Sequence, residues 1–322
     1  MKSFYELEKL EFLIKNNRSL IRAEQLAHVN VENTELPIWS VCMGSRDPGV
    51  PVLALFGGVH GLEKIGSRAV LAYLYGLVSR YSWDRTFQEL LKKIRIISIP
   101  IVNPSGMIMH RRSNLNGVDL MRNAPQDAKE NVQFLVSGHR LTSHLPWYRG
   151  RKRDQMETES RALINFFQSH VIDSPFMMSL DVHSGFGLND RIWYPYGCSS
   201  EVFPDYPVFQ RIYQAFSDTF PYHVYETESQ IESYGIHGDL WDFLTLENRK
   251  QSGHNPSTLI PLTLEMGSWR WVKKNPQQLL DKSGIFNPIK RHRYERVMRR
   301  HFHLFDFLFH ATVNYKHWGD KQ

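Results

Sequence analysis

Hydrophobic and polar positions along the chain follow two periods, and together they predict a sheet covered by helices. Short apolar runs without polar breaks predict buried strands. Longer segments with apolar residues three or four positions apart predict helices. We expect strands at residues 36–43, 51–56, 94–102, 176–182, 223–228 and 259–264, and helices at 65–78, 85–93, 155–171, 207–220, 238–248 and 288–310.

The order of these elements predicts the fold class. Strands that alternate with helices build an α/β fold, in which helices cover both faces of one sheet. We expect a mixed, largely parallel twisted sheet. Residues 4–27 space their apolar side chains as a helix does, so we predict an N-terminal helical segment over about residues 1–30. No repeat or linker divides residues 1–322, and we expect a single domain with a basic helix at about 288–310.

Composition narrows the class of protein. The chain has 322 residues, 42% hydrophobic and 13% aromatic, which is ample for a packed core. No apolar run approaches the length of about 18 residues that a membrane span needs, and the N-terminus has no apolar signal sequence. The two cysteines, Cys42 and Cys198, exclude a disulfide framework and a zinc-thiolate site. We expect a cytoplasmic enzyme of bacterial type, and the sequence carries no signal for an oligomeric state.

Much of the net charge of +6 lies in two basic stretches, residues 149–153 and 290–301. Such a stretch binds an anionic partner such as nucleic acid, or it is a solvated loop or helix face. Neither stretch carries a nucleic-acid-binding motif or a row of stacking aromatic residues. We interpret both as solvated and expect neither nucleic acid nor a membrane as a partner.

Polar residues of complementary types follow four of the predicted strands. His60 and Glu63 stand in a glycine turn after the second strand, while Asn103, His183 and Glu265 follow or end later strands. In open α/β sheets, ligands bind beyond the carboxyl ends of the strands. A histidine nitrogen and a carboxylate oxygen three residues apart can bind one divalent metal ion. The same pair can also be a loop histidine and a glutamate that complements a helix dipole.

Five motifs, in order, resemble those of the zinc carboxypeptidases of the carboxypeptidase A type. They are GGVHGLE, NPSG, NGVDLMRN, SLDVHSG and TLEMGS, and the resemblance covers roughly residues 50–270. It implies one zinc ion per chain, bound by His60, Glu63 and His183. It also implies a hydrolase in which Glu265 is the general base for a metal-activated water.

The arginine-rich segment between these motifs implies the substrate contacts. By resemblance, Arg112 or its neighbour Arg111 stabilises the developing oxyanion, and Asn114 stands beside them as a substrate-binding residue. Arg122 resembles the arginine that binds the terminal carboxylate of the substrate by a forked contact. Tyr234 matches the tyrosine that covers the substrate, or it is an ordinary aromatic residue of a loop.

Three further positions bear on this site. The family has asparagine directly before the second arginine, whereas this chain has Met121, which removes one hydrogen bond to the substrate carboxylate. Trp241 falls where the family sets side-chain specificity, and its bulk would shrink the pocket. Asp181 shares a strand face with His183 and either orients that imidazole or points elsewhere.

The sequence leaves three functions to compare. The first is a carboxypeptidase or peptide amidase that cleaves an amide bond next to a free carboxylate in a small peptide. The second is an N-acyl amino acid deacylase, similar to the aspartoacylase and succinylglutamate desuccinylase branch, which adds a C-terminal β-domain where this chain has a predicted helix. The third is an inactive carboxypeptidase-like binding protein, which the intact His60, Glu63, His183 and Glu265 disfavour.

Overall fold

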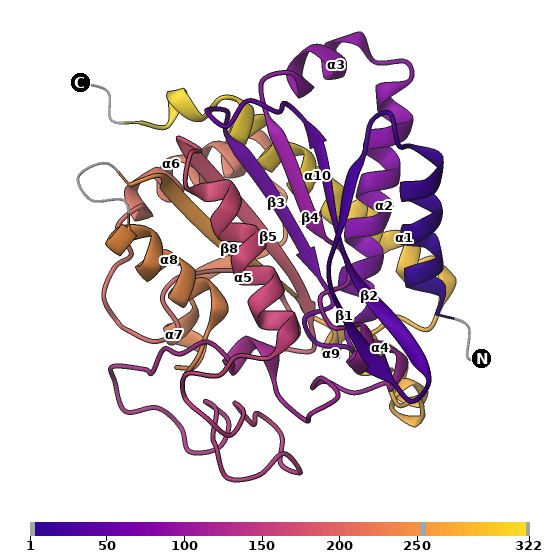
Figure 1. Cartoon of the computed structure of the whole chain (residues 1–322), viewed down its shortest axis with the longest axis vertical. Coiled ribbons are helices and arrows are strands. Elements are labelled where there is room, and N and C mark those ends of the chain that lie inside the picture. Colours follow the sequence, from indigo (N-terminus) through magenta and orange to yellow (C-terminus); the bar gives the residue numbers. More distant parts are fainter. Residues whose placement is uncertain (1–3, 252–255, 320–322) are drawn as a thin grey trace.

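A mixed sheet forms the centre of the molecule in the computed structural model, which describes residues 4–251 and 256–319 (Figure 1). Its strands are β1 (Arg22–Val31), β2 (Thr34–Gly44), β3 (Val52–Gly57), β4 (Arg95–Ile99), β5 (Phe176–Ser184), β6 (Asp190–Tyr194), β7 (Tyr225–Ser229) and β8 (Thr258–Met266). The order across the sheet is β1-β2-β4-β3-β5-β8-β6-β7. Four of the seven neighbouring pairs are parallel, which confirms the predicted fold class.

Helices cover both faces of this sheet (Figure 1). One face packs against α1 (Tyr5–Asn16), α2 (Lys64–Tyr81), α3 (Arg85–Leu91), α6 (Tyr206–Thr219) and α10 (Arg291–Val313), and the other against α5 (Thr158–Val171) and α8 (Leu240–Gln251). Shorter elements are α4 (Pro104–Ile108), α7 (Gln230–Ser233), α9 (Trp269–Lys274) and the 3-10 helices η1 (Leu120–Arg122), η2 (Pro276–Leu280) and η3 (Tyr315–His317). Every residue of β3 and β5 is buried, because both faces of these strands are covered.

The prediction for the N-terminal segment was wrong in part. Helix α1 ends at Asn16, and residues 22–31 form the edge strand β1 rather than a second helix. β1 pairs antiparallel with β2 across a tight turn in which Glu32 has a φ of 53°. None of its side chains is fully buried, so its mixture of polar and apolar residues resembles an amphipathic helix. Pairing with β2 outweighs that local preference.

The site lies where three parallel strands end side by side. β3, β5 and β8 are consecutive in the sheet, so the turns that follow them meet at one edge. The register places His183 of β5 directly opposite Glu265 of β8. Within residues 4–251 and 256–319, no helix is both long enough and apolar enough to cross a membrane.

Candidate active site

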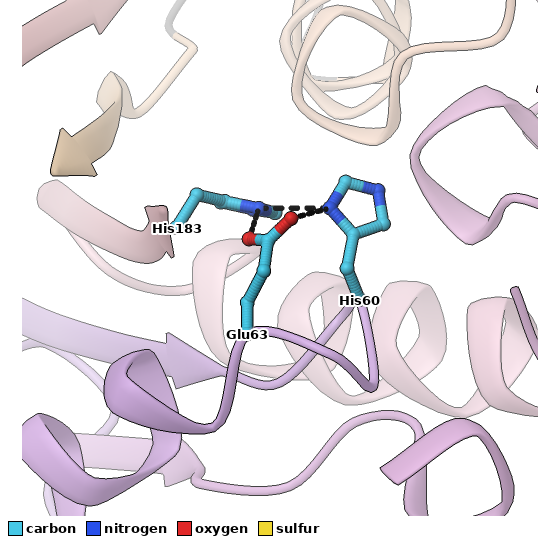
Figure 2. Close-up of side chains that lie close together, drawn as sticks. All are labelled: His60, Glu63 and His183. Atoms are coloured by element: carbon cyan, nitrogen blue, oxygen red, sulfur yellow. Dashed lines mark hydrogen bonds and ion pairs between the residues drawn. The ribbon is translucent and has the colours of Figure 1, made fainter. Parts of the chain in front are cut away.

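The three predicted metal ligands converge beyond the ends of β3 and β5 (Figure 2). The Nδ1 atom of His60 lies 2.8 Å from Oε1 of Glu63, and Nδ1 of His183 lies 2.9 Å from Oε2 of the same carboxylate. The two Nδ1 atoms are 3.2 Å apart. The ligand atoms of the three buried side chains all lie within 4.8 Å of one another, which is close enough to share one ion.

Two glycines allow the backbone to bring these ligands together. A Cβ at Gly66 in α2 would lie 2.1 Å from the carbonyl oxygen of Val182, so only glycine lets the helix pack this closely on β5. A Cβ at Gly61 would lie 2.0 Å from the carbonyl carbon of Gly106. Any larger residue at these positions would push Glu63 and its turn away from the strand that carries His183.

Each imidazole is held from behind by a buried carboxylate. Nε2 of His60 lies 3.1 Å from Oδ1 of Asp119, and Nε2 of His183 lies 2.7 Å from Oδ2 of Asp181. An acceptor at Nε2 keeps the ring proton there and leaves Nδ1 free to bind a metal ion. Of the two orientations considered for Asp181, the one that orients His183 is therefore confirmed. Asp119 was not among the site residues predicted from the sequence, although its place in the GVDLMRN motif was an available signal.

The electrostatics of the ligand cluster favour a cation. Burial raises the pKa of Glu63, but the two histidine rings more than offset this effect and lower it. Burial lowers the pKa of His183, but Asp181 and Glu63 more than offset it and hold the pKa well above its usual value. A cation is therefore favoured at this point, and two imidazole nitrogens with one carboxylate are a known zinc donor set. The residues present fit the zinc ion that the sequence implies.

Asp119 also joins the metal ligands to the two arginines. Its Oδ2 accepts hydrogen bonds from Nε of Arg112 at 3.0 Å and from Nη1 of Arg122 at 2.9 Å. Arg112 in addition donates to Oε1 of Glu63 at 3.3 Å. Burial raises the pKa of Asp119, but these cations hold it well below its usual value. Arg111 is exposed and lies outside the cavity, so only Arg112 of the two candidates reaches the site.

Most of the predicted site residues line one cavity of about 430 Å³. It is lined by His60, Glu63, Arg112, Arg122, His183, Tyr234 and Glu265. Glu265 accepts a hydrogen bond from the backbone N–H of Phe186 at 2.9 Å. Burial, together with the nearby Glu63, raises the pKa of Glu265 to about 8. Tyr234 packs against Phe186 with 5.8 Å between ring centroids.

Besides Arg111, the predicted residues Asn114 and Trp241 lie outside this cavity. Asn114 is buried, with its Oδ1 accepting from Val118 N–H at 3.0 Å and its amide donating to Glu157 at 2.9 Å. Its hydrogen bonds shape the arginine segment instead of facing a substrate. Trp241 is buried beneath the site, and its indole N–H donates to Asp181 at 3.1 Å. The expectation that Trp241 narrows the pocket is wrong, because this side chain supports the carboxylate behind His183.

The long segment between β4 and α5 contributes Gln133, Val136 and Trp147 to the lining of the cavity. Arg149 holds this segment in place, because its Nε donates to the carbonyl oxygen of Arg122 at 3.0 Å. Its side chain is buried, so interpreting the whole 149–153 stretch as solvated was wrong for Arg149.

The C-terminal segment closes the site from another side. Phe286 lines the cavity. The Oδ1 atom of Asn287 accepts from the backbone N–H of Ile65 at 2.9 Å, and its amide donates to the carbonyl oxygen of Leu62 at 2.7 Å. Asn287 therefore clamps the turn that carries the predicted metal ligands His60 and Glu63. Phe286 and Asn287 were not predicted from the sequence, because no local pattern connects them to the site; 222 positions separate Asn287 from Ile65.

A mixed sheet with a histidine–glutamate–histidine donor set at the ends of its parallel strands is typical of zinc-dependent hydrolases. A family model described as zinc carboxypeptidase matches residues 22–268, which is most of the chain. The chain therefore belongs to the zinc carboxypeptidase family.

Curated relatives that match the chain by sequence are carboxypeptidases. Carboxypeptidase SOL1 of Arabidopsis thaliana is 24% identical over 176 residues, 51% of this chain and 31% of that protein. The carboxypeptidase N catalytic chain of Rattus norvegicus is 26% identical over 196 residues, 54% of this chain and 42% of that protein. The chain thus spans less than half the length of these curated relatives.

Solved structures share the fold at low sequence identity. The crystal structure of thrombin activatable fibrinolysis inhibitor aligns with a TM-score of 0.66 and 17% identity, covering 97% of this chain and 75% of that one. The carboxypeptidase A of Helicoverpa armigera aligns with a TM-score of 0.64 and 17% identity, covering 94% of this chain and 71% of that one.

Proposed function

We propose that this protein is a zinc-dependent carboxypeptidase that removes the C-terminal residue of a small peptide. One observation carries the proposal. The three metal ligands share a single buried cavity with a carboxylate of raised pKa and with two arginines. A hydrolase that cleaves an amide bond beside a free carboxylate needs this combination of groups.

The chain's own side chains supply the proton transfer and the charge stabilisation. A zinc ion, when bound, supplies Lewis acidity that acidifies water and polarises a carbonyl group. Glu265 accepts a proton from the attacking water and returns it to the leaving amine. Burial and the nearby Glu63 raise its pKa to about 8, so its proton uptake and release fall nearer to neutral pH than those of an ordinary glutamate. Arg112, fixed by Asp119, donates to the carbonyl oxygen as negative charge develops there.

Arg122 is the proposed contact for the free carboxylate of the substrate. Its Nη1 donates to Asp119 and its Nε donates to the carbonyl oxygen of Val136 at 3.0 Å. Its remaining N–H groups are available to a carboxylate in the cavity that Arg122 lines. Met121 lines the same cavity, and its thioether offers no N–H donor where the family has an asparagine. Arg122 therefore makes this contact without the usual amide beside it.

The cavity favours a neutral side chain on the residue that is released. Its ionisable lining groups, within the part of the chain that the structure describes, are the metal ligands, the general base Glu265, the two arginines Arg112 and Arg122, and Tyr234. The rest of the lining is neutral and includes Met121, Val136, Trp193 and Ile236. A lysine or arginine side chain would enter without a dedicated carboxylate partner, which makes its desolvation costly.

We favour this function over the two alternatives. The family model that matches residues 22–268 describes a zinc carboxypeptidase. A protein that binds a peptide without cleaving it would not need the metal ligands, the general base and the two arginines together in one cavity.

Release of the C-terminal residue from N-acylated dipeptides tests the proposal. We expect the zinc-loaded protein to cleave substrates ending in phenylalanine or leucine, and those ending in arginine about 100-fold more slowly. Glu265→Gln should keep its zinc and lose activity by about a hundred- to ten-thousand-fold. Cleavage of N-acyl amino acids but of no dipeptide would replace the carboxypeptidase with the deacylase. A normal rate in Glu265→Gln would remove its role as the base.

A further inference from the structure

A second cavity, of about 140 Å³, lies between α9 and the N-terminal half of α10. Basic side chains dominate its lining, which includes Arg270, Lys274, Arg293, Arg296 and Arg300. None of these residues lines the proposed active site. Two basic segments that are separate in the sequence thus form one concave surface.

Two of these arginines are held in place without losing their charge. Nη1 of Arg293 donates to the carbonyl oxygen of Trp271 at 2.8 Å, and Nη2 of Arg270 donates to Oδ1 of Asn189 at 2.9 Å. Both acceptors are neutral. Because the guanidinium groups are already positioned, an incoming ligand loses less conformational freedom when it binds them.

The positive charge of the cavity is largely uncompensated. Arg300 has a carboxylate partner, Asp190, at 2.8 Å. Within residues 4–251 and 256–319, Arg270, Lys274, Arg293 and Arg296 have no carboxylate within 4.0 Å. Four cations around one small cavity repel one another unless an anion lies between them.

The start of α10 adds to this unfavourable charge distribution. Its first turn contains no acidic residue, and no side chain caps it. Basic residues at a helix N-terminus oppose the helix dipole, whereas an anion there is stabilised by it. His292, in that first turn, lines the cavity, so a ligand in the cavity lies against the positive end of the helix.

We propose that this cavity binds a phosphate-class oxyanion carried by a small molecule. The planar guanidinium group of arginine matches the oxygen geometry of phosphate. A dianion also neutralises more of the excess positive charge than a single carboxylate does. The cavity is concave and enclosed by two helices, whereas a nucleic-acid duplex would need a longer basic track. The site is separate from the metal centre and does not depend on the proposed carboxypeptidase activity.

Isothermal titration calorimetry of the full chain with inorganic phosphate, and separately with inorganic sulfate, tests this site. We expect saturable binding that weakens about tenfold in Arg296→Gln and again in Lys274→Gln, since each removes a charge-assisted hydrogen bond. Both side chains are exposed, so these variants should fold normally. Arg291→Gln is the matched control, because it removes the same charge from the same end of α10 but lies outside the cavity.

The other outcomes overturn the proposal. Equal weakening in Arg291→Gln would mean that net charge, not the cavity, attracts the anion. Binding that is lost in Arg122→Ala and kept in Arg296→Gln would place the anion in the active site. Binding of a short DNA duplex without any binding of phosphate or sulfate would make the surface a nucleic-acid contact instead.

Discussion

Replacing Arg122 with alanine separates carboxylate recognition from the rest of the site. The side chain is 2% exposed, and two of its nitrogens are engaged by Asp119 and Val136. Two N–H donors toward the substrate carboxylate, at about 1.5 kcal/mol each, amount to about 3 kcal/mol. That energy corresponds to a loss of about 150-fold in kcat/KM. We expect the loss for peptides with a free C-terminal carboxylate and a much smaller one for the same peptides as C-terminal amides.

The assay compares both substrate forms on the wild type, Arg122→Ala and Arg111→Ala. Arg111 is the matched control, because it is an exposed arginine of the same segment that does not line the cavity. Loss of Arg122 also removes a partner of Asp119, which holds His60, so zinc content is measured in each variant. An equal loss on acid and amide substrates, with zinc retained, would refute the carboxylate contact.

Three further predictions concern metal binding and stability. Removing zinc with a chelator should lower the thermal midpoint of the wild type, since a ligand present at about 1,000 times its Kd stabilises the folded state by about 4 kcal/mol. His60→Ala should contain no zinc, and its thermal midpoint should not change with chelator. A change equal to that of the wild type would exclude His60 as a ligand. Asn287→Ala should weaken zinc binding about tenfold or more, as measured by competition with a chelating dye, because the turn at residues 60–65 loses its two hydrogen bonds to Asn287. An unchanged zinc affinity would show that the turn keeps its conformation without Asn287. Burial lowers the pKa of His301 from 6.5 to about 4. Between these two pH values the unfolded state binds more protons than the folded state, so the free energy of unfolding falls as the pH decreases. The loss amounts to about 2 kcal/mol at pH 5. Urea unfolding at pH 7.5 and 5 should therefore show a smaller pH difference in His301→Gln, and an identical difference would contradict this account.

The hydrophobic pattern predicted most helices and strands, because the pattern that indicates each of them lies within its own residues. The continuous apolar runs of β3 and β5 require cover on both faces, and the runs alone therefore indicated central strands. Strands at or near the edges of the sheet were harder to predict from local pattern. β1 is half-exposed along its length, and β6 is five residues long, so pairing with a neighbour decides what each becomes.

The residues of the candidate site likewise divide into those that a local pattern indicates and those whose position depends on packing. His60, Glu63, His183 and Glu265 stand directly after or at the ends of strands, and their residue types limit what they can bind. The choice of Arg112 over Arg111, and the placement of Asn114 outside the cavity, depend on the path of an irregular segment that no periodicity describes.

By itself, the sequence determined the fold class, the order of its central strands along the chain and the identity of the groups that can hold zinc. The fold class and the strand order follow from periods of two to four residues, whereas the zinc-binding groups are what the resemblance of the five ordered motifs implies, in agreement with the chemistry of their side chains. Only the tertiary structure decided which groups meet. Asp119 behind His60, the Asn287 clamp and the basic cavity of α9 and α10 all join distant segments. Such contacts depend on how whole elements pack, and no local pattern of residues encodes that packing.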